Sequence, residues 1–203
     1  MEKKGKVRNH FGAKEIAFTA VLLAICIVSQ FFKNLSIFIT GPIINVCLCL
    51  AVVFVNLPCA IILAVITPLT AYLIATSPVM NAVPGIIPLI MCGNIVLVVA
   101  TNFLLKKDVF TAKGFSYSFI SYAKAVICAL LKGLFMGLTI SLWLLPTFIP
   151  AQSPLRGKLS VFQTTFSLFQ FITALIGFVY FFIISAALKR FWHGENSATD
   201  HVA

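Results

Sequence analysis

Lys132 is the residue in this sequence best placed to bind a charged molecule, because it lies deep inside a long apolar run. About 14 residues separate it from Pro146 at the end of that run, which in a helix corresponds to about 21 Å. A lysine at such depth in a bilayer costs on the order of 2.5–3.5 kcal/mol on insertion scales. It could snorkel to an interface, bind backbone carbonyls or polar side chains, or bind an anionic ligand.

The acidic residues and histidines lie outside the apolar parts of these runs. They are Glu2, Glu15, Asp108, Glu195 and Asp200, with His10, His193 and His201. Proton-coupled carriers commonly use intramembrane carboxylates, and embedded aspartyl hydrolases need a pair of them. The sequence also lacks a Walker lysine loop and an H-E-x-x-H motif. We therefore expect neither an ATPase nor a metalloenzyme, and no catalytic residue, metal site or cofactor.

Amide side chains accompany Lys132 in the parts of the apolar runs that we expect to lie toward the outer surface. They should face the interior of a bundle, because an unpaired amide in lipid is costly. Each alone is more often a helix–helix hydrogen bond than a ligand contact, but together they predict a polar pocket that opens outward. The predicted substrate-binding residues are Lys132, Asn94, Asn45, Asn81, Gln163, Gln170 and Trp143.

The neighbours of Lys132 along the same run have structural interpretations. Lys124 lies about two turns nearer the cytoplasmic end and is expected to snorkel to the inner surface. Gly133 and Gly137 have the G-x-x-x-G spacing that lets helices approach closely. The six cysteines all lie in apolar runs, and we expect them to pack between helices as small apolar residues.

The elements that must position these residues are membrane-spanning helices. Of 203 residues, 61% are hydrophobic and 10% are charged, and the mean hydropathy is +1.07. A soluble domain of this length cannot hide so much apolar surface, whereas runs of about 20 apolar residues cross a bilayer as helices. The predicted fold is an all-α integral membrane bundle of six transmembrane helices. The predicted spans are Ile16–Phe32, Pro42–Val55, Cys59–Ala75, Gly85–Leu105, Phe119–Leu145 and Val161–Leu188.

The distribution of lysine and arginine predicts the topology. With the N-terminus inside, ten of these 15 residues lie in cytoplasmic segments, three in outer loops and two in the fifth span. We therefore expect a basic cytoplasmic N-terminus at 1–12, a transmembrane domain at 13–190 and a polar cytoplasmic tail at 191–203. The net charge of +10 does not indicate nucleic-acid binding, because the basic residues flank apolar runs instead of forming a patch. The second and third spans are short, so a reentrant hairpin is an alternative.

The first predicted helix carries a stripe of small residues. Ala13, Ala17, Ala20 and Ala24 are spaced four, three and four residues apart, which places them on one helix face. Such a face packs closely against another helix. The other helix could belong to the same bundle or to a different membrane subunit.

Over nearly its whole length the chain resembles the substrate-binding S components of energy-coupling factor (ECF) transporters. The resemblance rests on the size, the six spans, the basic N-terminus and the A-x-x-x-A spacing in Ala13-Lys14-Glu15-Ile16-Ala17 and Ala20-Val21-Leu22-Leu23-Ala24. Further similar segments are Thr40-Gly41-Pro42-Ile43-Ile44-Asn45, Thr67-Pro68-Leu69-Thr70 and the stretch from Ile87-Pro88 to Gly93-Asn94.

The resemblance implies a subunit that captures a small water-soluble vitamin or related micronutrient at the outer face of a prokaryotic plasma membrane. The alanine face would dock on the transmembrane T component, and two ATPase subunits would drive release. The segments Asn34–Gly41, Thr76–Gly85 and Pro146–Lys158 would close over the ligand. The alternatives are a self-sufficient secondary transporter, a membrane assembly factor or embedded enzyme, and a structural membrane protein without a ligand.

Overall fold

The structure, a computed structural model, describes residues 12–32, 36–75, 77–112 and 117–199, with the backbone alone for 190–199. The described residues are helical apart from short turns and include no strand, which confirms the all-α prediction. Six helical stretches among them are long and apolar enough to cross a membrane, as predicted. They are Ala13–Gln30, Ile37–Val55, Leu57–Ile74, Ile86–Leu104, Phe119–Phe148 and Pro154–Lys189. The predicted basic segment 1–12 lies outside the described residues except for Gly12.

Several of these stretches combine more than one helix type. The α-helices are α1 (Ala13–Gln30), α2 (Ile37–Leu50), α3 (Leu57–Ile74), α4 (Pro78–Ala82), α5 (Ile86–Leu104), α6 (Lys106–Thr111), α7 (Phe119–Met136), α8 (Leu145–Phe148), α9 (Leu159–Phe166) and α10 (Leu168–Thr199). Two π-helical segments, η1 (Ala51–Val55) and η2 (Gly137–Leu144), continue α2 and α7. A 3₁₀ segment, η3 (Pro154–Lys158), precedes α9.

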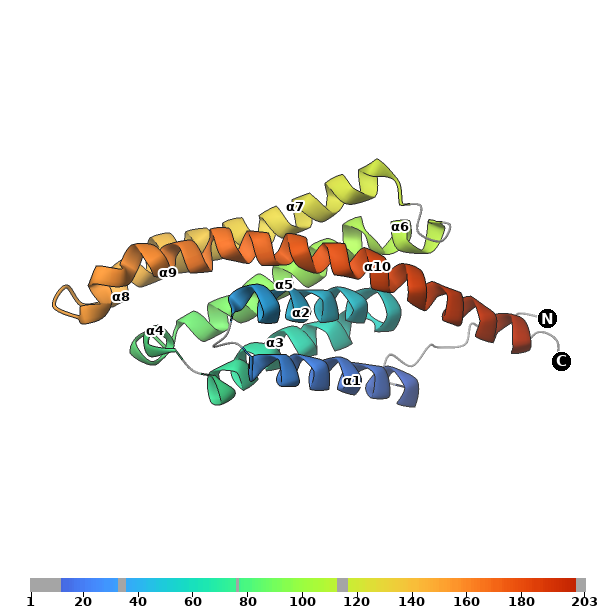
Figure 1. The fold of residues 1–203 in the computed structure, drawn as a ribbon, viewed down its shortest axis with the longest axis horizontal. Coiled ribbons are helices and arrows are strands. Elements are labelled where there is room, and N and C mark those ends of the chain that lie inside the picture. The colour runs from blue at the N-terminus through green and yellow to red at the C-terminus, as the bar shows by residue number, and fades with distance from the viewer. Residues whose placement is uncertain (1–11, 33–35, 76, 113–116, 200–203) are drawn as a thin grey trace, which may run out of the picture.

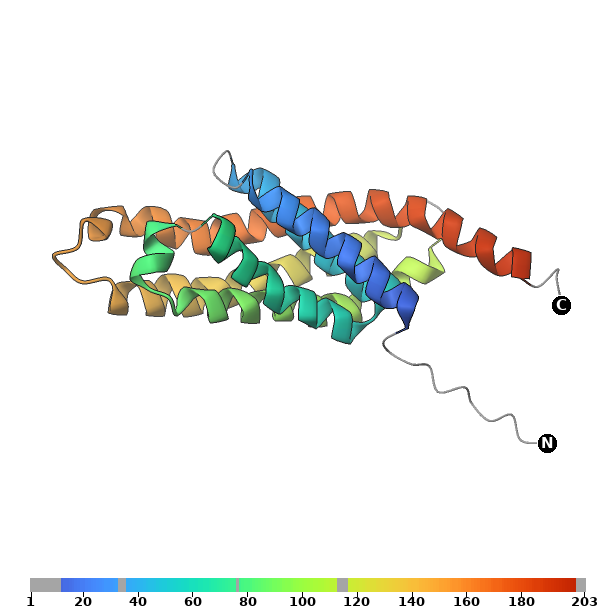
Figure 2. The same cartoon turned by 90° about the horizontal axis from the view of Figure 1, so that it is seen from below.

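The helices form an elongated bundle with two distinct ends (Figure 1). The short helices α4, α8 and α9 lie together at one end, which we call the loop end. The start of α1 and the end of α10 lie at the opposite end, as an even number of spans requires. Figure 2 shows α1 on the outside of the bundle, crossing its neighbours obliquely.

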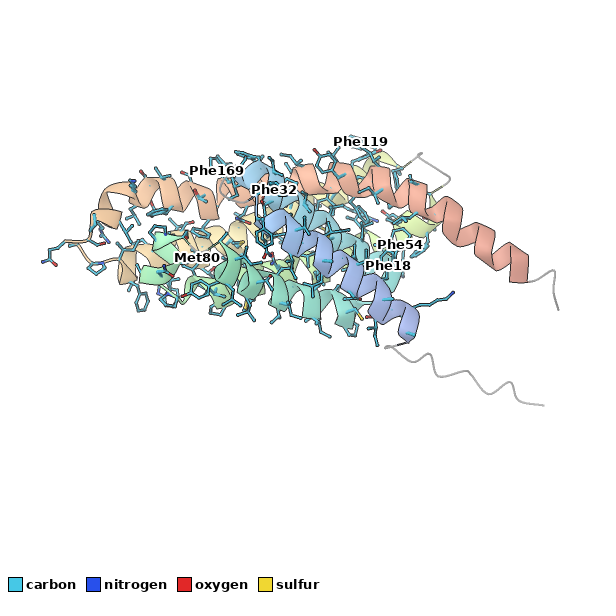
Figure 3. The ribbon with its side chains drawn as sticks, turned by 60° about the horizontal axis from the view of Figure 1, so that its bottom comes forward. Phe18, Phe32, Phe54, Met80, Phe119 and Phe169 are labelled. Atoms are coloured by element: carbon cyan, nitrogen blue, oxygen red, sulfur yellow. The ribbon has the colours of Figure 1, made fainter. Side chains whose placement is uncertain are left out.

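Two apolar clusters form the core. The larger packs α2 and η1 among α1, α3, α5, α7 and α10, with Leu48 and Phe181 fully buried. The smaller joins α4, α5, η2 and α9 at the loop end and includes Met80, which is labelled in Figure 3. Along both α5 and α7 a buried polar residue, Asn94 and Lys132 respectively, separates the two clusters. The core is therefore interrupted at one level by polar groups.

The second span begins earlier than predicted. The Ser36 hydroxyl accepts a hydrogen bond from the Phe38 amide, so the helix starts at Ile37 and Pro42 lies inside it instead of in its first turn. The Asn56 side chain caps α3 in the same way, accepting from the Cys59 amide at 2.8 Å. The second and third spans contain 19 and 18 residues, so each is long enough to cross a bilayer without forming a reentrant hairpin.

The last span is interrupted and longer than predicted. The chain bends at Ser167 (φ −116°, ψ −83°), between α9 and α10. Beyond the bend, α10 runs to Thr199, so residues 191–199 of the predicted polar tail are helical. Residues 200–203 of that tail lie outside the described residues.

Lys124 forms an ion pair, which the sequence reading did not predict. Its Nζ lies 2.9 and 2.8 Å from the two carboxylate oxygens of Asp108 in α6, and the Ser121 hydroxyl donates to the same carboxylate at 3.1 Å. The carboxylate lies close enough because α6 folds back beside the first turns of α7. Lys124 therefore joins these two helices instead of only reaching toward the membrane surface.

We expect Asp108→Asn to lower the free energy of unfolding by up to about 1 kcal/mol, because the ion pair is partly exposed. Thermal unfolding in detergent measures the change, which should shrink at high salt as screening increases. A double-mutant cycle with Lys124→Met is the control, since the second substitution should cost little once the partner is gone. Fully additive effects would show that the pair contributes nothing.

Candidate functional site

A cavity of about 290 Å³ lies toward the loop end of the bundle. Its wall is formed by α2, α3, α4, α5, α7, α9 and α10, so it lies between segments far apart in the sequence. Most of the wall is apolar, and none of the described residues that line it is acidic. The polar residues on the wall are Thr40, Asn45, Thr67, Ser77, Asn94, Lys132, Thr165 and Gln170. We call this space the loop-end cavity.

Lys132 lines this cavity and is 3% exposed. Its Nζ donates hydrogen bonds to Oδ1 of Asn45 at 2.6 Å and to Oδ1 of Asn94 at 2.8 Å. Short bonds from an ammonium group to amide oxygens offset part of the cost of removing the charge from water. Of the three arrangements that the sequence left open, the structure shows binding to polar side chains. The same geometry leaves the lysine on a cavity wall, where an anion can reach it.

A proline explains how Asn94 is oriented toward the lysine. Pro68 lies inside α3 and has no backbone N–H, so the Ala64 carbonyl loses its intrahelical partner. The Asn94 side-chain nitrogen lies 3.5 Å from that carbonyl oxygen, while its side-chain oxygen faces Lys132. The Asn94 amide therefore bridges α3 and α7: its nitrogen faces the Ala64 carbonyl of α3, and its oxygen accepts the hydrogen bond from Lys132 of α7.

Glycines let the helices that carry this cluster approach each other. A Cβ atom at Gly177 of α10 would lie 2.8 Å from the Cβ of Asn45, closer than two carbons can pack. At Gly133, next to Lys132, a Cβ would lie 2.8 Å from the Cβ of Phe171. At Gly137 it would lie 3.2 Å from the Cβ of Ser167, between α9 and α10, which is a less severe contact. The G-x-x-x-G pair therefore packs closely beside Lys132, as predicted.

Two buried polar atoms on or next to the cavity wall lack a hydrogen-bond partner among the described residues. They are Oγ1 of Thr67, which lines the cavity, and Oε1 of Gln30. Gln30 is held from its other end, where Nε2 donates to the Thr67 carbonyl at 3.0 Å. A buried hydroxyl without a partner is destabilising, and a ligand in the cavity could supply the missing acceptor or donor.

Four of the seven predicted binding residues line the loop-end cavity, namely Lys132, Asn45, Asn94 and Gln170. The structure brings the first three into direct contact, although their sequence positions span three different helices. Their positions along the predicted spans had indicated that they lie at similar levels of the bundle. Their inward direction followed from the cost of exposing amides to lipid.

The other three predicted residues do not line the cavity. Gln163 instead holds α9 to η2, because its Nε2 donates to the Ser141 carbonyl at 2.9 Å while the Ser141 hydroxyl donates to the Gln163 carbonyl at 2.8 Å. Trp143 is 57% exposed on the outside of the bundle, and Asn81 is exposed at the end of α4. These three residues were predicted to bind substrate from their depth along the spans alone. Their side chains point away from the loop-end cavity, so they do not form part of its wall.

Sequence reasoning missed Thr67 and the apolar part of the wall. That part comes largely from α4 and α9, short helices at the loop end, and includes Met80, Phe162 and Phe166. The signal that could have identified Thr67 is the proline that follows it, because a proline inside a span marks a place where backbone groups need other partners.

The alanine stripe on α1 is open. Ala13, Ala17, Ala20 and Ala24 are all exposed, while α1 buries Leu22, Cys26, Ser29 and Gln30 on its other side. Only 22% of this span is buried, compared with 67% of the second span. Within the described residues, the stripe is therefore not used for packing inside its own bundle.

Among the described residues, no three His, Cys, Asp or Glu side chains are grouped so that they could hold a metal ion. Comparisons with family models, curated proteins and solved structures find no match to this chain. The geometry of the loop-end cavity is therefore the basis for assigning a function.

Proposed function

We propose that this chain is the substrate-capture subunit of an ECF-type importer in the cell membrane of a prokaryote. The observation that carries the proposal is a cavity near one end of the bundle with a buried lysine, held by two amides, on its wall. The loop end faces outward in this proposal, and both termini face the cytoplasm. A small water-soluble micronutrient occupies the cavity.

The composition of the wall favours a capture subunit over a self-sufficient carrier. Carriers that couple transport to protons commonly place a carboxylate at the substrate site. In the part of the chain that the structure describes, no acidic residue lines the loop-end cavity. Asp108, which lies near the start of the fifth span, is paired with Lys124. Energy for release would therefore come from separate ATPase subunits.

The open face of α1 supplies a surface for the partner. Small side chains allow a helix of another subunit to approach closely, and in lipid such packing is a main contribution to helix association. The S components that this chain resembles use an alanine face in this way. We therefore assign Ala13, Ala17, Ala20 and Ala24 to docking on a T component.

The proposal predicts a stable complex with defined partners. When the tagged chain is co-expressed with an ECF T component and its two ATPases, all three should co-purify in detergent. Ala20→Trp should abolish this association, because the indole prevents close approach on the alanine face. The thermal stability of the isolated chain should not fall, since Ala20 is exposed.

Ile25→Trp is the matched control. Ile25 is also exposed on α1, at 46%, but a rotation of about 100° per residue places it away from the alanine stripe. This variant should retain the T component and the ATPases. If the wild-type chain never associates with these subunits, the proposed function is wrong. If both tryptophan variants lose the association equally, the alanine stripe is not the specific docking surface.

A further inference from the structure

We infer that the loop-end cavity selects a monocarboxylic acid with a largely apolar body, and that Lys132 and its two amides bind the carboxylate. This inference rests on the proposed function, because it names the substrate class of the same site. It follows from which hydrogen-bonding groups the cluster leaves available, from the number of charges on the wall and from the wall's apolar character.

The cluster around Lys132 offers hydrogen-bond donors to a ligand. An ammonium group has three N–H donors and no acceptor, and two of those donors are directed to Asn45 and Asn94. Because each amide turns its oxygen toward the lysine, each turns its NH₂ group elsewhere. One N–H of Asn94 is directed to the Ala64 carbonyl oxygen. The third ammonium proton, the Asn45 NH₂ group and the second N–H of Asn94 are left as donors, which suit a ligand group that only accepts.

The charge on the wall limits the ligand to one negative charge. Lys132 is the only lysine or arginine among the described residues that line the cavity, and no acidic residue opposes it. A doubly charged phosphate would leave one buried negative charge without a partner, which is costly. A carboxylate accepts hydrogen bonds through both oxygens and carries one charge, so it matches the cluster.

The remainder of the wall fits an apolar body of modest size. Ile44, Pro68, Met80 and Phe162 are among the side chains that line the space beyond the lysine. Its volume of about 290 Å³ is at the small end of the range of ligand pockets. The unpartnered hydroxyl of Thr67 adds one polar contact on this wall. A ligand with several polar groups would leave most of them facing apolar side chains.

Matched probes can test this inference on the full chain in lipid nanodiscs. A panel of monocarboxylic acids with aliphatic or aromatic bodies of graded length is compared with the corresponding primary amides and monophosphate esters. Binding is measured by isothermal titration calorimetry, and the signal from empty nanodiscs is subtracted. The best acid should bind at least about tenfold more tightly than its amide, because it gains charge-assisted hydrogen bonds. It should also bind more tightly than its phosphate ester.

Each other outcome overturns the inference. If no acid binds better than its amide, the lysine does not recognise a carboxylate, and if a phosphate ester binds best, the site accepts a double charge. These results are distinct from the test of the proposed function. If the chain prefers acids but does not associate with ATPases, the substrate class holds and the importer function is wrong. If it associates with ATPases but does not prefer acids, the importer function holds and the substrate class is wrong.

Discussion

Lys132→Met should weaken the binding of the best carboxylic acid by at least about tenfold, equivalent to about 1.4 kcal/mol. The substitution removes the one positive charge that the described residues place on the wall of the loop-end cavity, and it keeps a side chain of similar length. Binding of the matched amide should change far less, because the amide makes no ion pair. The ratio of the two dissociation constants, measured in nanodiscs, is therefore the decisive quantity.

Lys124→Met is the matched control for this experiment. It removes a lysine from the same helix, about two turns away, but Lys124 pairs with Asp108 and does not line the cavity. Its dissociation constants should equal those of the wild-type chain. An unchanged affinity in Lys132→Met would mean that the lysine binds only Asn45 and Asn94 and has no role toward a ligand.

Gly177→Ala should destabilise the bundle by about 1–3 kcal/mol, although it adds only one methyl group. The new Cβ would lie 2.8 Å from the Cβ of Asn45 and 3.2 Å from the Pro42 carbonyl oxygen, and neither atom is the free end of a flexible side chain. Helix α10 must therefore move away from α2. Because Asn45 holds Lys132, the same displacement should lower the affinity for the carboxylic acid.

Gly157→Ala provides the comparison, because a Cβ at Gly157 would meet no atom within 4 Å. Its thermal unfolding midpoint in detergent should stay close to that of the wild-type chain, with a stability change within about 0.5 kcal/mol. If Gly177→Ala unfolds at the same temperature as Gly157→Ala, α10 and α2 are not packed as closely as the structure describes.

The fold could be predicted from the sequence because the bilayer restricts what an apolar chain can form. Runs of the right length must be helices, and the number of runs gives the number of spans. The same restriction predicted that the amides face the interior of the bundle, but it left open whether Lys132 reaches an interface, binds polar groups of the protein or binds an anion. Depth along a span and side-chain polarity identified Lys132, Asn45 and Asn94 as candidate binding residues. Both properties follow from a single sequence.

What could not be predicted depends on rotation about helix axes and on short helices. Gln163 and Trp143 have suitable depth, yet one bonds the backbone of η2 and the other faces outward. The π-helical turns of η2 change which side of the helix each residue after Met136 occupies. A prediction based on 3.6 residues per turn therefore assigns these residues to the wrong side. The partner of Lys124 was missed because Asp108 lies outside the apolar runs and reaches it only after the chain folds back.

The pairing of one buried lysine with two neutral amides also has a consequence for the membrane potential. Moving one elementary charge across a membrane takes about 2.3 kcal/mol per 100 mV. The hydrogen bonds described for Lys132 come from neutral amide oxygens, so a movement that changes the depth of Lys132 in the membrane carries its positive charge through that field. A bound carboxylate would cancel this charge, so the binding site would add nothing to the voltage dependence of such a movement in the loaded state.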